Sequence, residues 1–157
     1  MTPTITIELA ETPKDIAAVK AIFLEYMAFI EDYLGESLDF QGTKKEFADF
    51  PDIYDALFLA KLGGQPVAAC GLKPFKPNIC ELKRLYSRPL GRGHGLGKKL
   101  TQATIMAARE KGYTQIYLDT DPGLKHANAV YEALGFTDIE RYYGNPMGRS
   151  RYMGLTL

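Results

Sequence analysis

The segment Arg92-Gly93-His94-Gly95-Leu96-Gly97 has the residue types and spacing that most clearly predict chemistry. Three glycines within five residues remove the side chains that would keep a ligand away from the backbone. A predicted strand precedes the segment and a predicted helix follows it, and the free N–H groups and positive dipole end of a helix's first turn attract anions. Together with the nearby Lys98 and Lys99, this favours a phosphate site. The alternative is a tight strand-to-helix turn without a ligand, with both lysines on a solvated helix face.

Two common nucleotide-binding motifs do not fit this glycine loop. The dinucleotide motif G-x-G-x-x-G would need glycine at Leu96 or at Lys98. The P-loop motif G-x-x-x-x-G-K-[ST] would need glycine at Arg92 and serine or threonine at Lys99. The pattern that does fit is R-x-x-G-x-G, which runs from Arg92 to Gly97.

The hydrophobic pattern places this loop inside a mixed α/β fold. Apolar and polar residues alternate over 4–9, as in a half-buried strand, and Thr12-Pro13 is a typical helix start. Gly63-Gly64-Gln65 between two apolar runs predicts a hairpin. In chain order we expect strands at 4–9, 56–62, 66–73, 78–86, 114–120, 137–143 and 149–157, and helices from Pro13 to about Asp32, at 43–50, after the glycine loop and at 124–134. This β-α-α-β-β-β-α-β-α-β-β order predicts one domain over residues 1–157, an α/β sandwich around a single mixed, twisted sheet.

Composition narrows the classes of function. Among 157 residues there are 19 basic and 19 acidic side chains, and a net charge of zero argues against a general nucleic-acid-binding protein. The apolar runs are shorter than the ~18–20 residues of a membrane span, and the amino-terminal residues lack the pattern of a secretory signal. We expect Cys70 and Cys80 to be buried free thiols, and the histidines and cysteines show no metal-ligand spacing. The predicted protein is cytoplasmic, with no membrane, nucleic-acid or metal partner.

The R-x-x-G-x-G motif, with its surroundings, resembles the GNAT N-acetyltransferase superfamily, whose signature Q/R-x-x-G-x-G/A binds the diphosphate of acetyl-CoA. The strand ELKRLYSRP before the loop, the strand IYLDT after it and the segment A-x-x-x-YEALGF (Ala127 to Phe136) match the family's order. The resemblance spans nearly all of the chain and is strongest over 80–136. It implies the GNAT-like acyl-CoA N-acyltransferase fold. It also implies transfer of an acetyl group from acetyl-CoA to a primary amine, by direct attack in a ternary complex.

The same resemblance implies where the cofactor binds. Leu85, Tyr86 and Ser87 match the strand beside which the pantetheine arm fits, with one backbone N–H polarising the thioester carbonyl. The diphosphate would be held by Arg92, Gly93, His94, Gly95, Leu96, Gly97 and Lys98. One position departs from the family: many members have an asparagine seven residues before the tyrosine of the second segment, where this chain has Leu124.

Two residues match catalytic positions of the family. An acceptor amine with a pKa of ~10.4 must lose a proton before it attacks, and the departing thiolate benefits from gaining one. Glu81, the sole acidic residue between Asp55 and Glu110, matches the base glutamate of some branches, which often acts through water. Its alternative role is a structural partner of a neighbouring basic residue. Tyr131 matches the family's tyrosine acid near the sulfur, and its alternative role is a packed aromatic.

The charges are sorted along the chain in a way that bears on the acceptor. Residues 25–55 carry nine acidic and two basic side chains, a net charge of −7, whereas residues 73–99 carry eight basic and one acidic, a net charge of +7. The basic stretch includes the glycine loop, and the acidic stretch covers a region that borders the acceptor in this family. A cationic amine drawn by the acidic stretch is one hypothesis, and a solvated surface without a role in recognition is the other.

The sequence leaves open the identity of the acceptor, the residues that contact it, the oligomeric state and one alternative to an enzyme. The acceptor is a small molecule, an amino acid or a peptide or protein amine. The loop Tyr142-Tyr143-Gly144-Asn145-Pro146 resembles a substrate-side loop, and the aromatics Tyr26, Tyr33 and Phe40 either cover the substrate or form core. Pairing through the last strands could produce a homodimer. The alternative to an enzyme is a catalytically silent, CoA-binding regulatory or interaction module of the same fold.

Overall fold

The computed structural model describes residues 3–35, 43–144 and 150–157, and of residues 43–45 it describes the backbone alone. Its sheet has seven strands in the order β1-β2-β3-β4-β5-β7-β6. The strands are β1 (Ile5–Leu9), β2 (Ala56–Leu62), β3 (Gln65–Lys76), β4 (Ile79–Ser87), β5 (Gln115–Thr120), β6 (Thr137–Asp138) and β7 (Arg151–Thr156). The helices are α1 (Pro13–Leu34), α2 (Thr43–Ala48), α3 (Leu96–Glu110) and α4 (Lys125–Ala133), with a 3₁₀ turn at Pro89–Gly91.

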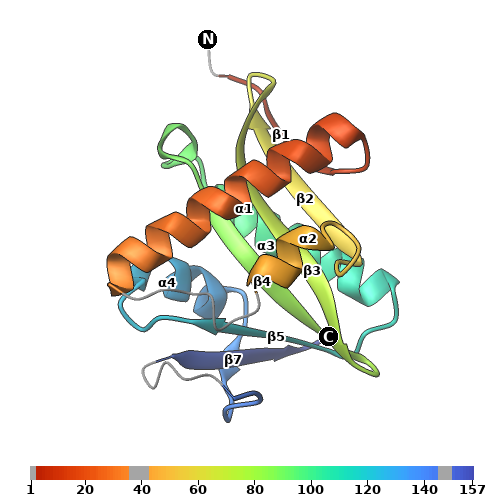
Figure 1. Cartoon of the computed structure of the whole chain (residues 1–157). Helices are drawn as coiled ribbons and strands as arrows, with labels where there is room; N and C mark the ends of the chain where they lie inside the picture. The colour runs from red at the N-terminus through yellow and green to blue at the C-terminus, as the bar shows by residue number, and fades with distance from the viewer. Residues whose placement is uncertain (1–2, 36–42, 145–149) are drawn as a thin grey trace.

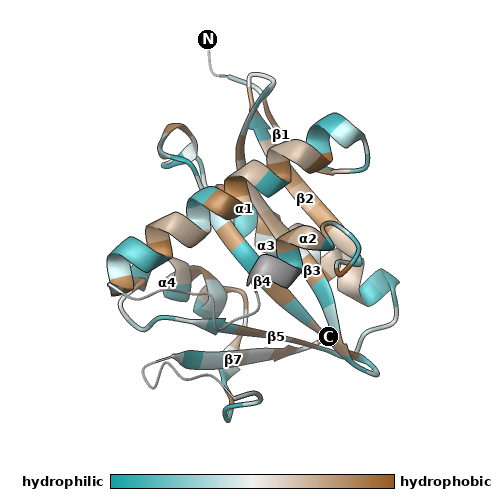
Figure 2. Ribbon diagram, in the orientation of Figure 1, coloured by the Kyte–Doolittle hydropathy of each residue, from teal (hydrophilic) through white to brown (hydrophobic). Residues whose placement is uncertain are grey.

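Helices cover both faces of this sheet. Figure 1 shows α1 and α2 in front of the strands and α3 and α4 behind them. Side chains of β2 to β5 pack with α3 and α4 in one core, and other side chains of β2 and β3 pack with α1 in a second core. The strands beneath α1 are accordingly mostly hydrophobic (Figure 2). The predicted fold class, a mixed α/β sandwich, is confirmed.

Local sequence signals determine where the main elements begin and turn. Thr12 accepts a hydrogen bond from the backbone N–H of Asp15 at 3.2 Å and caps α1, whose first residue is Pro13. The helix ends at Gly35, which has a φ of 69°. At the β2–β3 hairpin, Gly63 and Gly64 have φ values of 57° and 84°. Two consecutive positive φ values are those of a type I′ turn, so glycine is the residue that this tight connection requires.

Strands β4 and β5 are parallel neighbours that separate part-way along their length. Only three pairs join them, from Ile79 with Gln115 to Glu81 with Tyr117. Beyond Glu81, β4 continues to Ser87 without pairing to β5. The separation opens the sheet next to the start of α3, where the glycine loop lies.

One predicted strand is wrong in its extent. The strand expected over 137–143 is confined to Thr137–Asp138, although the Ile139 N–H still bonds to the carbonyl of Tyr152 at 2.9 Å. Beyond that point Tyr142 and Tyr143 both direct their hydroxyls to carboxylates on β4 and β5. Neighbouring residues of a strand point to opposite faces of the sheet, so a regular strand could not make both contacts.

Candidate active site

The glycine loop leads into α3 through two residues with left-handed backbone. Gly93 has a φ of 86° and Gly95, the N-cap residue of α3, a φ of 68°. A Cβ atom added to either glycine would meet nothing within 4 Å, which leaves open space over the loop. In the described part of the chain no side chain caps α3, so the N–H groups of its first turn are available to an anion.

A cleft of about 550 Å³ opens above this loop. We call it the glycine-loop cleft. Its walls come from the carboxyl-terminal end of β4, the loop, and parts of α1 and α4. Eight of the ten predicted cofactor-binding residues line it: Leu85, Tyr86, Ser87, Arg92, Gly93, Gly95, Leu96 and Gly97. The lining does not include the other two, His94 and Lys98.

The cleft is also lined by residues that the sequence did not indicate as cofactor-binding. Lys125 and His126 line it from the start of α4. Arg92 lies with its guanidinium carbon 5.9 Å from the ring centre of Tyr86. Arg92 and Lys125 therefore supply positive charge to the cleft from two separate elements, which suits an anionic ligand. The signal of Lys125 and His126 in the sequence was weak, because a lysine and a histidine at a helix start are equally typical of a solvated surface.

The stretch of β4 that lines the cleft is unpaired on its β5 side and irregularly paired on its β3 side. On the β5 side the strands have already separated. On the β3 side the register passes from Gly71 with Lys83 to Ala69 with Tyr86, so β4 contains one extra residue, a bulge at Arg84 and Leu85. Arg84 itself has a φ of 61°. On the β5 side the backbone of Leu85, Tyr86 and Ser87 has no strand partner and is available to a ligand in the cleft.

A second group of polar side chains lies where β4 and β5 separate. We call it the carboxylate cluster: Glu81, Lys83, Asp119, Tyr142 and Tyr143. Glu81 is only 4% exposed and accepts a hydrogen bond from the Tyr142 hydroxyl at 2.8 Å. Asp119 accepts one from the Tyr143 hydroxyl at 2.9 Å. The Lys83 ammonium lies 3.9 Å from Glu81 and 3.7 Å from Asp119, between the two carboxylates.

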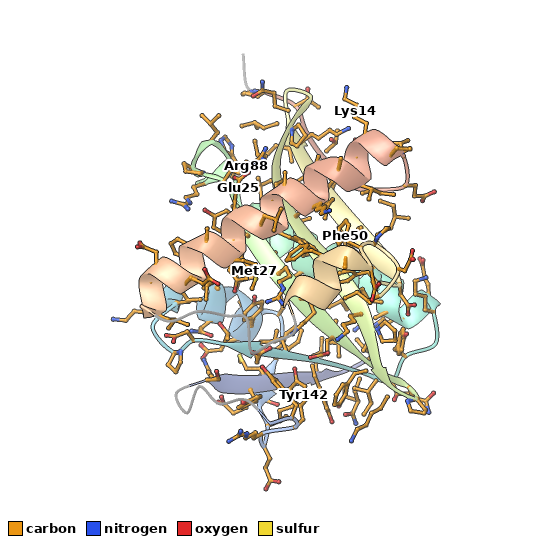
Figure 3. The ribbon with its side chains drawn as sticks, viewed as in Figure 1. Lys14, Glu25, Met27, Phe50, Arg88 and Tyr142 are labelled. Atoms are coloured by element: carbon orange, nitrogen blue, oxygen red, sulfur yellow. The ribbon has the colours of Figure 1, made fainter. Side chains whose placement is uncertain are left out.

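The tyrosines of this cluster are held in their protonated form. Burial, followed by the negative charge of Glu81, raises the pKa of Tyr142 far above its ordinary value. Burial and the charge of Asp119 do the same for the pKa of Tyr143. Both phenols therefore act as hydrogen-bond donors that orient the carboxylates. Tyr142 comes from the segment beside β5 and β7 (Figure 3), far along the chain from Glu81.

Tyr131 lies inside the core between the sheet and α4. It is 6% exposed, and its ring centre is 5.8 Å from that of Phe136. Burial, and then the neighbouring Tyr26, Cys70 and Asp119, raise the pKa of its hydroxyl. Packing and proton donation are thus compatible for this residue, because a buried phenol stays protonated. The lining of the cleft includes Val130, its neighbour in α4, but not Tyr131.

Two further kinds of feature, a metal-binding cluster and a membrane-spanning helix, are absent from the described residues. Within residues 3–35, 43–144 and 150–157, no three His, Cys, Asp or Glu side chains are grouped so as to hold a metal ion. No helix in the same ranges combines the length and apolar character needed to cross a membrane.

Comparison with known proteins decides the family. The acetyltransferase (GNAT) family matches residues 20–136, about three quarters of the sequence. The chain belongs to the GNAT acetyltransferase family. This membership bears out the predicted enzyme class, an acyltransferase.

Relatives and solved structures agree with the GNAT assignment. The chain is 31% identical to an uncharacterised N-acetyltransferase of Schizosaccharomyces pombe, over 98% of this chain and 95% of that protein. It is 39% identical to an uncharacterised N-acetyltransferase of Escherichia coli, over 57% of this chain and 55% of that protein. A GNAT-family acetyltransferase from Staphylococcus aureus shares the fold with a TM-score of 0.77 at 20% identity, covering 98% of this chain and 99% of that one.

The GNAT family departure at Leu124 has a structural explanation. Leu124 packs against the cluster of Met27 and Ile30 on α1 and also lines the glycine-loop cleft. An apolar side chain at this position therefore ties the start of α4 to α1. The roles assigned to Glu81, Tyr131 and the cofactor-binding residues stay predictions.

Proposed function

We propose that this GNAT protein is an acetyl-CoA-dependent N-acetyltransferase that transfers acetyl to a primary amine by direct attack in a ternary complex. The supporting observation is the glycine-loop cleft, where an uncapped helix start meets strand backbone that is unpaired on its β5 side. The first suits a diphosphate and the second suits an amide-bearing arm that ends in a thioester. Acetyl-CoA contains these parts in that order.

In this proposal the cofactor lies along β4. The pantetheine arm binds beside Leu85, Tyr86 and Ser87, and the diphosphate sits on residues 92–98, in a cleft that Lys125 and His126 also line. Backbone N–H groups at the bulge polarise the thioester carbonyl, because they face charge that develops on its oxygen during attack.

Glu81 and Tyr131 handle the two protons in this proposal. Glu81 receives the proton of the acceptor ammonium, directly or through a water molecule, which makes the amine nucleophilic. Tyr131 donates its hydroxyl proton towards the departing thiolate, and its raised pKa keeps that proton in place until then. Lys83 lies near Glu81, so the structural role of Glu81 as an ion-pair partner coexists with the catalytic one.

The acceptor in this proposal is a cationic amine. The two carboxylates and one ammonium of the carboxylate cluster carry a net charge of −1 beside the cleft. The acidic stretch 25–55 offers less support, because Glu25 and Glu46 pair with arginines and Asp55 accepts a hydrogen bond from Tyr113. Within that stretch, Glu36, Asp39 and Phe40 lie outside the described residues, as do Asn145 and Pro146 of the predicted substrate-side loop.

The test is release of free thiol from acetyl-CoA across a panel of amines, with Tyr131→Phe assayed beside the unmodified protein. We expect turnover with at least one class of amine and a loss of about tenfold or more in kcat for Tyr131→Phe. Full activity of Tyr131→Phe would remove that residue from the proposal and leave it a packed aromatic. Tight CoA binding with no turnover on any amine would replace the enzyme by a CoA-binding regulatory module.

A further inference from the structure

Arg84 has a backbone conformation that arginine rarely adopts. Among the described residues only Asn78 and Arg84 combine a side chain with a positive φ. Asn78 is in the turn between β3 and β4, and asparagine tolerates left-handed backbone well. Arg84 lies within a strand, and such strained positions persist only where the surrounding structure enforces them. Its contacts therefore show what enforces the bulge.

The Arg84 side chain is buried in an ion pair that connects β4 to α2. Its Nη2 atom lies 2.7 Å from Oε1 of Glu46, and its Nε atom lies 3.4 Å from Oε2. Both side chains are 8% exposed. The Tyr54 hydroxyl donates a hydrogen bond to Oε2 of Glu46 at 2.5 Å, so the carboxylate has partners from two other segments. Two contacts to one planar guanidinium fix its direction as well as its position.

Both members of this pair remain charged despite their burial. Burial alone would raise the pKa of Glu46, but the hydrogen bonds from Arg84 and Tyr54 and the charge of Arg84 hold it below its ordinary value. Replacing a buried ion pair by apolar side chains often leaves stability unchanged or improves it. Stability alone is therefore a weak reason for a buried pair at this strained position.

We propose that Glu46 and Arg84, with Tyr54, position the β4 bulge so that backbone N–H groups of the cleft-lining residues that follow Arg84 face the thioester carbonyl. The inference rests on the proposed acetyl-CoA function. Arg84 directly precedes Leu85 and Tyr86, which line the cleft, and the ladder to β3 skips Arg84 and Leu85. The pair acts through the backbone and touches neither substrate nor cofactor, so its members are positioning residues.

The test is the double variant Glu46→Gln/Arg84→Met. The amide oxygen of the introduced glutamine can still accept the Tyr54 hydrogen bond, and methionine fills much of the volume of the arginine stem, so no buried charge is left unpaired. We expect an unfolding midpoint close to that of the unmodified protein and a kcat reduced at least tenfold. Affinity for CoA, which has no thioester carbonyl, stays within twofold, whereas the preference for acetyl-CoA over CoA falls.

Two further variants keep the test decisive. Glu25→Gln/Arg88→Met removes an exposed ion pair that joins α1 to the segment just after β4 (Figure 3), and it should leave kcat and both affinities unchanged. Arg84→Lys keeps the charge without the two-point contact, so its kcat should lie between those of the double variant and the unmodified protein. If the double variant does not fold, Arg84→Lys alone tests the positioning role of the Glu46–Arg84 pair.

The outcomes separate this inference from the proposed function. Unchanged kcat and unchanged preference for acetyl-CoA in a folded double variant, or in Arg84→Lys, would overturn the positioning role alone. Absence of CoA binding by the unmodified protein would overturn the proposed function itself. A parallel loss of CoA and acetyl-CoA affinity would show that the pair supports the cleft in general and would also overturn the positioning role.

Discussion

The glycine-loop cleft and the carboxylate cluster are neighbours built in different ways. The cleft offers mainly backbone groups, from a loop with two left-handed glycines and from the end of β4, which has no strand partner on its β5 side. The cluster consists of side chains that meet from three separate stretches of sequence and are oriented by hydrogen bonds of 2.8 and 2.9 Å. A backbone site is suited to a large constant ligand, and a side-chain site can change with the acceptor. The difference suggests that cofactor binding and acceptor choice can be altered independently.

Glu81→Gln should have the largest effect, because a base in the carboxylate cluster would contribute about a hundredfold or more to kcat. Its affinity for CoA should stay unchanged, because the lining of the cleft does not include Glu81. Steady-state kinetics and calorimetry measure the two quantities. Tyr142→Phe is the matched control. It removes the hydrogen bond to Glu81 and keeps the charges of Glu81 and Lys83, so we expect a much smaller loss of kcat. Equal kcat for Glu81→Gln and the unmodified protein would exclude Glu81 as the base.

Gly95→Val should have the opposite effect to Glu81→Gln: it should lower the affinity for CoA, because the change lies in the cleft. A β-branched residue at a φ of 68° is strained by roughly 1–3 kcal/mol, and moving the loop to relieve that strain displaces its N–H groups. We expect CoA affinity to fall by about tenfold or more, because ~1.4 kcal/mol corresponds to tenfold. Gly35→Val is the control: Gly35 has a φ of 69°, also has open space, and ends α1. Equal CoA affinity in the two variants would remove the loop from cofactor binding.

Asp119→Asn should have a smaller effect, limited to the acceptor. Loss of one carboxylate would raise the KM of a cationic amine roughly fivefold, as expected for a partly screened charge contact of about 1 kcal/mol. The KM of acetyl-CoA and the rate with an aromatic amine that is neutral at pH 7 should not change. High salt should reduce the difference between the two amines. An equal effect on both amines would show that Asp119 does not select by charge.

The sequence predicted the residues of the glycine-loop cleft better than the contacts of the carboxylate cluster. Glycine spacing before a helix start is a local signal, and eight of the ten predicted cofactor-binding residues line the cleft. The partners of Glu81 are not local: Tyr142 is sixty-one positions away and is placed by a segment that leaves the sheet after Asp138. A regular strand over 137–143, as the sequence predicts, gives no indication of this contact. Likewise, nothing near Arg84 in the sequence indicates that Glu46 is its partner.

The last effect is that of Glu46 on how stability depends on pH. Its pKa in the folded protein is lowered from the ordinary value of 4.5, so its contribution to stability is fully present above that value. The contribution is lost as the pH falls through the lower, folded pKa. Chemical unfolding between pH 7 and pH 3 should therefore show a decline in stability below about pH 4.5 that is less steep in Glu46→Gln. Identical slopes would mean that Glu46 has the same pKa in the folded and unfolded states.

Calorimetric titration with CoA and with pantetheine tests the central claim most directly. The two ligands share the amide-bearing arm, and only CoA carries the diphosphate that the N–H groups of residues 92–97 would hold. The account predicts measurable binding of CoA and binding of pantetheine weaker by at least about a hundredfold, since charge-assisted hydrogen bonds to an anion are the strong ones. Equal affinity for both ligands, or no heat with CoA, would contradict it.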